Sequence, residues 1–391
     1  MPIFGFPCWA LARAHGGFAG KVRRVNSVSD FTYDALAGRV VFGAGSARSQ
    51  LVAELDRLGA ERILLVAAEA EVELARELAR AAGERVAATF TGVQPHVPVA
   101  VAAQARALAR DVAADVLLSV GGGSTTGTAK AIALEQELPI LAVPTTYAGS
   151  EMTPVWGMTE GQKKTTGRSL AVLPRVVIYD PELTLTLPAS VTGPSAMNAI
   201  AHCVEALYVP AANPITTLVA LEGIRALAQG SPGAVERPRD IGARSLTLLG
   251  AYLAGSSFAA VGGGLHHKIC HILGGALDLP HAETHTIVLP HVVAYFAPAI
   301  PAAAAAVDAA LGGGGDDAAA GGLYDLARRL GAPAGLREIG MRESDLEPMI
   351  ALVHSGAAAA EHPRTVDEPA VRTILTGAFE GSRPVLTGEA R

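Results

Sequence analysis

Histidine is concentrated in one short segment of this 391-residue chain. Six of its 11 histidines lie between positions 266 and 291. His267 and His271 are four residues apart and share one face of a helix predicted over 266–277, and His281 follows Pro280 and can fold back toward that face. Imidazole groups bind divalent metals, transfer protons or bind anionic substrates. The segment therefore predicts a site for one of these, with chance clustering of histidines as the alternative.

A second polar group lies on a mostly apolar helix predicted over 195–209. Asn198, His202 and Glu205 occupy positions i, i+4 and i+7, away from the apolar face of that helix. Two interpretations stay open. The group is either a solvated stripe with one hydrogen-bonded histidine, or a polar face that completes a site with the histidine-rich segment.

A glycine-rich turn, GGGS at 121–124, directly follows a strand predicted over 114–120 and precedes a predicted helix. Glycines let the backbone approach a ligand, and a helix N-terminus offers free amide groups to a phosphate. The strand predicted over 139–143 ends in the hydroxyl-rich stretch PTTYAGS at 144–150. Because the carboxyl ends of parallel strands meet at one edge, the two stretches predict a nucleotide site. A tight strand-to-helix turn is the alternative for the glycines alone.

The elements that must position these groups change character near residue 180. Before it, predicted strands and helices alternate, which is typical of a parallel sheet covered on both faces. After it, strand signals almost vanish. The predicted fold class is α/β plus all-α: an N-terminal extension (1–30), a doubly wound dinucleotide-binding α/β domain (31–183) and a mostly helical substrate and catalytic domain (184–391). An Ala/Gly-rich stretch at 302–322 predicts a short helix and a flexible connector.

Composition argues against several classes of protein. A net charge of −6 is unlike the basic excess of a nucleic-acid binder. No apolar run reaches the roughly 18–20 residues that a membrane helix needs, so no membrane contact is expected. Three cysteines are too few for a disulfide framework, and the first 20 residues lack the basic region of a secretory signal. The expected location is the cytoplasm.

The ordered motifs resemble one known family. In sequence they are RVVFG, GGGSTTGTAKAIAL, VPTTYAGSEMT, LPRVVIYDPELTLTLP, SAMNAIAHCVEA, HHKICHILGG and LPHAETHTIVLPH. From Phe31 to the C-terminus the chain resembles the iron-containing alcohol dehydrogenase superfamily, and within it the branch of maleylacetate reductases. The markers of that branch are FTYDALAGRVVFG, GGGSTTG, PTTYAGSE and Asn198.

The resemblance implies NADH as cofactor, with NADPH as the alternative. The cofactor-binding positions that it implies are Gly122, Gly123, Ser124, Thr145, Thr146 and Lys164. Glu69, after a strand predicted over 62–66, is a candidate for the ribose 2′-hydroxyl, which favours NADH. The family's metal is held by one aspartate and three histidines, and these positions are Asn198, His202, His267 and His281. His271 corresponds to the histidine beside the nicotinamide.

Asn198 is a departure from the metal-binding pattern of the superfamily. Its amide oxygen is a weaker metal donor than a carboxylate, so we expect weak metal binding or none, and no metal requirement. The implied reaction is the NAD(P)H-dependent reduction of the C=C bond of maleylacetate to 3-oxoadipate, in the degradation of aromatic compounds. The implied catalytic residues are His202, His267, His271 and His281. The implied contacts to the dicarboxylate substrate are Asn198, His202, His267, His281 and Lys268, and the resemblance suggests a homodimer.

Two alternatives to this function remain open at the level of sequence. One is a metal-dependent alcohol dehydrogenase or carbonyl reductase of the same superfamily, in which Asn198 serves as a ligand. The other is a non-catalytic nucleotide-binding homologue, against which the dense set of histidines argues. Lys268 also has a simpler interpretation, as a solvated surface lysine.

Overall fold

The N-terminal half is built on one parallel sheet. The structure is a computed structural model that describes residues 31–36, 38–161, 163–313, 318–357 and 361–386, so the predicted extension at 1–30 lies outside the described residues. The strands run in the order β1-β8-β5-β4-β2-β3, and all neighbours are parallel. Their bounds are β1 Arg39–Phe42, β2 Ile63–Val66, β3 Val86–Phe90, β4 Val116–Gly121, β5 Ile140–Pro144 and β8 Val176–Tyr179.

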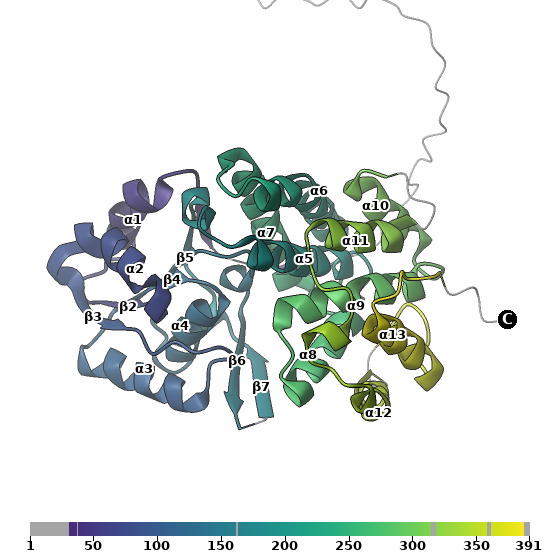
Figure 1. The fold of residues 1–391 in the computed structure, drawn as a ribbon. Coiled ribbons are helices and arrows are strands. Elements are labelled where there is room, and N and C mark those ends of the chain that lie inside the picture. Colours follow the sequence, from purple (N-terminus) through teal and green to yellow (C-terminus); the bar gives the residue numbers. More distant parts are fainter. Residues whose placement is uncertain (1–30, 37, 162, 314–317, 358–360, 387–391) are drawn as a thin grey trace, which may run out of the picture. The chain divides into compact units, whose positions relative to one another are not determined.

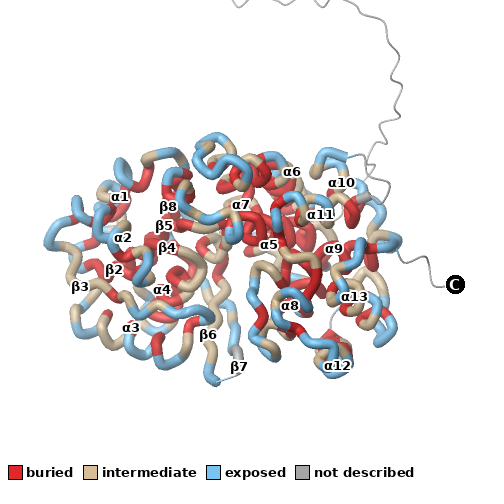
Figure 2. Tube along the Cα trace, viewed as in Figure 1, coloured by how far each residue is buried: buried red, intermediate tan, exposed pale blue. Residues whose placement is uncertain are grey.

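Helices cover both faces of this sheet, as its continuous apolar strands require (Figures 1 and 2). These helices are α1 Ser46–Arg57, α2 Val72–Ala79, α3 Val99–Asp111 and α4 Gly123–Gln136. Successive residues of β4 serve opposite faces, because Leu117 packs in the cluster that contains α3 and α4, and Leu118 packs in the cluster that contains α1 and α2. The predicted doubly wound α/β half is therefore confirmed.

The second half is helical, which confirms the other part of the predicted fold class (Figure 1). Its helices are α5 Ala189–Glu205, α6 Pro214–Glu236, α7 Ile241–Val261, α8 Leu265–Leu277, α9 His281–Phe296, α10 Pro301–Leu311, α11 Ala318–Arg329, α12 Leu346–Ala357 and α13 Glu368–Glu380. The stretch predicted as a helix and a connector contributes to both α10 and α11, and residues 314–317 between them lie outside the described part. The domain limits 31–183 and 184–391 stay predictions, since residues 33–391 form one compact unit.

No helix of the described residues is by itself long and apolar enough to cross a membrane. Helices α7 and α8 pass that test only as a pair, and the chain bends by 99° between them.

A β-hairpin between the two halves was not predicted from the sequence. Strands β6 (Val155–Glu160) and β7 (Lys163–Arg168) pair antiparallel around a turn at Gly161, which has a φ of +58°. Their residues lack the alternation of apolar and polar types by which a half-buried strand is recognised, so the sequence pattern did not predict these strands. Arg168 donates a 2.7 Å hydrogen bond to the carbonyl of Ala259 in α7, so the hairpin ties the sheet half to the helical half.

A buried lysine holds the segment between β5 and this hairpin. Lys130 of α4 is fully buried, and its Nζ donates hydrogen bonds to the carbonyls of Ser150, Thr153 and Val155 at 2.6, 2.7 and 2.8 Å. Burial lowers the pKa of Lys130 to about 7, and the neighbouring Glu151 partly opposes this shift. One side chain thus donates to three backbone acceptors of a segment that crosses the protein interior.

We expect Lys130→Met to destabilise the protein by about 2–4 kcal/mol, because three carbonyls lose a hydrogen bond from a buried ammonium group. Equilibrium denaturation at neutral pH measures the free energy of unfolding. Lys268→Met is the matched control, since Lys268 is exposed, and it should change that free energy by less than about 0.5 kcal/mol. Equal stability of the two variants would contradict the anchoring role of Lys130.

Candidate active site

The glycine-rich turn lies at the carboxyl edge of the sheet, where β4 and β5 end side by side. Gly121 pairs with Pro144, and the amide of Thr145 donates to the carbonyl of Gly121 at 3.2 Å. The predicted meeting of these two strand ends is therefore confirmed. The two sequence stretches form one continuous surface at that edge.

The glycines of this turn are needed because other groups press against them. Gly121 has a φ of +150°, and a β-carbon there would collide with the carboxylate of Glu71. A β-carbon on Gly122 would lie 3.0 Å from Cγ2 of Thr146, and one on Gly123 would lie 3.3 Å from Cβ of Ala148. The first helical hydrogen bond of α4 comes from the amide of residue 126, so the amides of residues 123–125, including Ser124, have no acceptor within the helix. These amides are available to a phosphate group.

Glu71 is a residue of this edge that the sequence analysis missed. It ends the short 3₁₀ segment Glu69–Glu71 after β2, and its carboxylate accepts a 2.5 Å hydrogen bond from Oγ1 of Thr145. Burial raises its pKa, and hydrogen bonds from Thr145 and the backbone of Gly122 oppose the shift. Glu69, the residue singled out from the sequence, is exposed instead. The segment after β2 is a 3₁₀ turn, which carries Glu71 rather than Glu69 onto the glycines.

The histidines from three helices form one cluster, as the sequence suggested. The rings of His202 (α5) and His267 (α8) stack with centroids 5.0 Å apart. His267 and His271 are 6.0 Å apart, His271 and His281 are 6.2 Å apart, and His281 lies 4.3 Å from His285 on α9. His281 is the first residue of α9 and does fold back toward α8. His285 is an additional member of the cluster. It is one of the six histidines between positions 266 and 291, but the sequence predicted no role for it.

The polar face of α5 is buried, which decides between its two interpretations. Asn198, His202 and Glu205 are 4%, 7% and 0% exposed. Glu205 accepts hydrogen bonds from the amides of Gly264 and His266 at 2.9 and 2.8 Å and from Nδ1 of His267. The Nδ1–H bond leaves Nε2 of His267 as the unprotonated nitrogen, turned to the cluster. Glu205 therefore fixes both the start of α8 and the tautomer of His267.

Burial keeps the inner histidines neutral. It lowers the pKa of His202, His267 and His285 well below the usual value, and the neighbouring imidazoles lower it further. Oδ1 of Asn198, Nδ1 of His202 and Nε2 of His267 have no hydrogen-bond partner among the described residues. Buried polar atoms are almost always satisfied in a working protein, so these three atoms are candidates for contact with a ligand.

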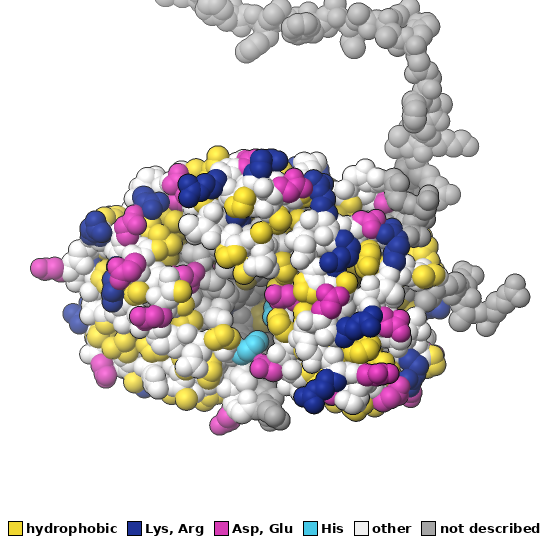
Figure 3. All heavy atoms as spheres, in the orientation of Figure 1, with side chains coloured by type: hydrophobic (Ala, Val, Ile, Leu, Met, Phe, Trp, Pro, Cys, Tyr) yellow, Lys and Arg dark blue, Asp and Glu magenta, His cyan; other side chains and the backbone are white. Residues whose placement is uncertain are grey.

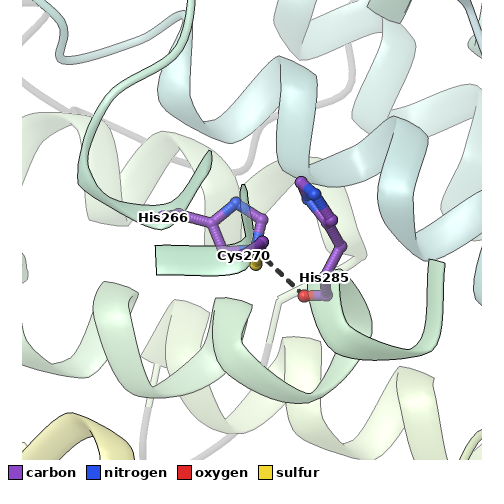
Figure 4. A group of neighbouring side chains, drawn as sticks. All are labelled: His266, Cys270 and His285. Carbon is purple, nitrogen blue, oxygen red and sulfur yellow. Dashed lines mark hydrogen bonds between the residues drawn. The ribbon is translucent and has the colours of Figure 1, made fainter. Parts of the chain in front are cut away.

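Behind this cluster, a group of three side chains joins α8 to α9 (Figure 4). Nε2 of His266 donates a 3.0 Å hydrogen bond to the carbonyl of His285, and Sγ of Cys270 lies 3.5 Å from the same nitrogen. Burial lowers the pKa of His266 to about 4 and raises that of the Cys270 thiol well above its usual range. The three groups are uncharged, and their contacts hold the two helices in register.

A cavity of about 530 Å³ opens onto the cluster between the hairpin and the helical half. His271 and His281 line it and are exposed, whereas His202 and His267 lie deeper. Figure 3 shows a hollow at the centre of this face with histidine visible at it. The loop after β5 reaches the same cluster, because a β-carbon on Gly149 would lie 3.6 Å from Nδ1 of His202.

Lys268, a predicted substrate contact, is not among the described residues that line this cavity. Lys268 is exposed on another face of α8, where its Cε lies 3.4 Å from the β-carbon position of Gly356 in α12. The helix repeat rotates it by about 100° from His267, so the structure gives the expected substrate contact of Lys268 no support. The side chain of Lys164 lies outside the described residues, and its cofactor contact stays a prediction.

Comparison with known proteins places the chain in a family. The family profile "Iron-containing alcohol dehydrogenase" matches residues 37–181, and "Fe-containing alcohol dehydrogenase family, C-terminal" matches residues 192–379. The chain belongs to the iron-containing alcohol dehydrogenase family. It is accordingly an NAD(P)H-dependent oxidoreductase, and a nucleotide is its cofactor.

Its relatives include enzymes of one activity. Maleylacetate reductase 1 of Cupriavidus pinatubonensis is 47% identical over 354 residues, which cover 90% of this chain and 98% of that protein. The crystal structure of maleylacetate reductase from Agrobacterium tumefaciens has a TM-score of 0.86 and 46% identity, over 91% of this chain and all of that one. The maleylacetate reductase structure from Rhizobium also has a TM-score of 0.86, with 45% identity over 91% and 99% of the two chains.

The residues at the family's metal position do not form a convergent set of ligands. In the described chain, His202, His267 and His281 do not together form a group whose ligand atoms all lie within 4.8 Å of one another. Two groups meet that distance, Glu205–His266–His267 and His266–Cys270–His285, but each contains an atom already engaged in a hydrogen bond. Asn198 also contributes no negative charge. The set present does not fit a tightly held iron ion.

The close contact of the glycine turn generates a prediction about the cofactor. Gly122→Val should raise the dissociation constant of NADH by well over tenfold, above about 1.4 kcal/mol, because the added side chain presses on Thr146 and blocks the free amides. Fluorescence titration measures this constant, and circular dichroism checks the fold.

Gly43→Val is the matched control. Gly43 follows β1 in the same sheet, and a β-carbon there has no atom within 4 Å. This variant should bind NADH like the unmodified protein. Unchanged NADH affinity in folded Gly122→Val would remove the glycine turn from the cofactor site.

Proposed function

We infer that this chain reduces the C=C bond of maleylacetate with NAD(P)H to give 3-oxoadipate, a step in the degradation of aromatic compounds. Near full-length identity of about 47% to maleylacetate reductases supports this function. The observation in the structure that carries it is a buried set of uncharged polar groups next to the histidines that line the cavity, with His267 6.0 Å from His271 between ring centroids. Asn198, His202 and His267 have unpartnered polar atoms, and none of the three is a carboxylate.

The cofactor supplies the hydride, which goes to the alkene carbon β to the ketone. A proton goes to the carbon next to the ketone, so that maleylacetate, NAD(P)H and one proton give 3-oxoadipate and NAD(P)⁺. Conjugation with the ketone spreads the incoming charge as an enolate. The site therefore needs hydrogen-bond donors that face the enolate oxygen, and an acid near the α-carbon.

The described residues offer candidates for the proton donor. His271 and His281 line the cavity and reach a bound substrate, so we assign the proton donor to this pair. Behind them, Glu205 holds His267 through Nδ1 and would stabilise a proton taken up at Nε2. Because burial lowers the pKa of His267, such a proton would be given up readily. His202 is stacked on His267 and shares this environment.

For the cofactor we propose a preference for NADH over NADPH. The carboxylate of Glu71 lies at the carboxyl edge of the sheet, after β2, beside Gly121 and Thr145. An acidic group in this place hydrogen-bonds a ribose 2′-hydroxyl and repels a 2′-phosphate. The homodimer and the cytoplasmic location expected from the sequence stay predictions.

We also propose that the reaction needs no metal. Two observations support this: His202, His267 and His281 do not form a convergent ligand group, and Asn198 is neutral. A divalent cation is held best by convergent ligands that include an anion. Lewis-acid polarisation is the role of the metal in an alcohol dehydrogenase, and the conjugated ketone of maleylacetate makes that role dispensable.

The function is tested by oxidation of NADH and NADPH with maleylacetate, simple aldehydes and simple ketones, before and after exhaustive treatment with EDTA. We expect maleylacetate to be the preferred substrate, NADH the preferred cofactor, and the rate to survive EDTA. Stoichiometric iron or zinc whose removal abolishes turnover would instead establish the metal-dependent alcohol dehydrogenase. Absence of cofactor oxidation with every compound would indicate a non-catalytic homologue.

The histidine cluster is tested by His267→Ala. We expect kcat for maleylacetate to fall by about a hundredfold or more, because the imidazole that Glu205 orients is lost. The dissociation constant for NADH should stay unchanged. His291→Gln is the control, since His291 is a buried histidine of α9 that packs against Gly377, away from the cluster. Wild-type kcat in folded His267→Ala would show that the cluster is not the catalytic centre.

A further inference from the structure

A fixed positive charge lies at the mouth of the cavity. Arg342, which precedes the short 3₁₀ turn Glu343–Asp345 and α12, lines the same cavity as His271 and His281. It is the only lysine or arginine among the lining residues of the described chain. The histidines identified from the sequence supply no fixed charge of this kind, and Lys268 lies outside the cavity.

The guanidinium of Arg342 is available to a ligand. It is exposed and makes no ion pair or hydrogen bond with any residue that the structure describes, whereas nearby Arg372 pairs with Glu347 and Arg337 donates to the carbonyl of Glu380. The backbone at Arg342 is nevertheless fixed, because its amide donates a 2.9 Å hydrogen bond to Oδ2 of Asp345. The backbone of Arg342 is thus held in place, while its guanidinium has no partner among the described residues.

The other charges of the cavity make this cation necessary for an anionic substrate. Asp278 and Asp345 also line it, and His96 faces it from the sheet half. Two carboxylates would repel a dicarboxylate dianion, and the lining histidines carry no fixed charge that would offset this repulsion. A guanidinium offers a carboxylate two parallel N–H donors, which gives both affinity and orientation.

We propose that Arg342 determines specificity by binding the carboxylate of maleylacetate that is farther from the alkene, on the methylene side of the ketone. This inference rests on the proposed function. With the alkene and ketone directed to His271 and His281, the remaining carboxylate extends toward the mouth of the cavity, where Arg342 lies. Substrates without that carboxylate lose this contact, and simple aldehydes and ketones are disfavoured.

The test compares two substrates that differ only in this group. Maleylacetate carries both carboxylates, whereas cis-4-oxopent-2-enoate keeps the alkene, the ketone and the first carboxylate but ends in a methyl group. In Arg342→Met we expect KM for maleylacetate to rise about ten- to thirtyfold, with kcat changed less than about twofold. KM for cis-4-oxopent-2-enoate and for NADH should stay unchanged. The inhibition constant of the product 3-oxoadipate should rise with KM for maleylacetate.

Lys268→Met is the matched control, because it removes the same charge from an exposed position outside the cavity. It should leave both substrates unaffected, and Arg342→Lys should restore part of the affinity for maleylacetate. If the wild-type enzyme reduces maleylacetate and Arg342→Met still discriminates between the two substrates, the proposed role of Arg342 is wrong and the proposed function stands. An equal rise of KM for both substrates in Arg342→Met would lead to the same conclusion. A wild-type enzyme that reduces no maleylacetate overturns the proposed function, and this inference with it.

Discussion

The site depends on the backbone of the segment between β5 and β6, which is buried between sheet and helices and must have its carbonyls satisfied. Lys130 donates to three of these carbonyls from the sheet side. Arg244, equally buried, donates to the hydroxyl of Tyr147 at 3.0 Å and to Thr192 of α5 at 2.9 Å. Lys130 and Arg244 thus connect the carboxyl edge of the sheet, where the cofactor is expected, to the helices that carry the histidine cluster. The loop that carries Thr145 and Thr146 has little freedom to move independently of α5.

The helical half solves a different problem, the burial of many titratable groups at one place. Burial alone would make an imidazolium or a carboxylate costly, so the cluster combines neutral rings with a single carboxylate that accepts three N–H donors. Glu205 carries that role, and its contact with His267 sets which nitrogen faces the substrate. The result is a polar but weakly charged pocket. This suits an enolate that forms transiently more than a metal ion that must stay bound.

Local sequence patterns were sufficient for most of the fold and for part of the site. The buried strands could be predicted because continuous apolar runs such as those of β2 and β4 leave few alternatives. The hairpin of β6 and β7 could not, since it depends on distant contacts: Thr159 donates to the carbonyl of His96 in the loop before α3, and Arg168 donates to Ala259 of α7. Glu71 was missed because the 3₁₀ turn after β2 shifts the acidic side chain by two residues. Arg342 was missed because no motif surrounds it.

The sequence by itself determined the family, the strand ends that meet at the cofactor edge, and the histidines that share a helix face. These depend on spacing along one element or on the order of motifs, which the chain carries locally. Only the tertiary structure decided whether the polar face of α5 is solvated or buried, which cation lies in the cavity, and which acid touches the glycines. Those properties depend on how elements far apart in the chain rotate and pack. A rotation of about 100° per residue separates His267 in the site from Lys268 outside it.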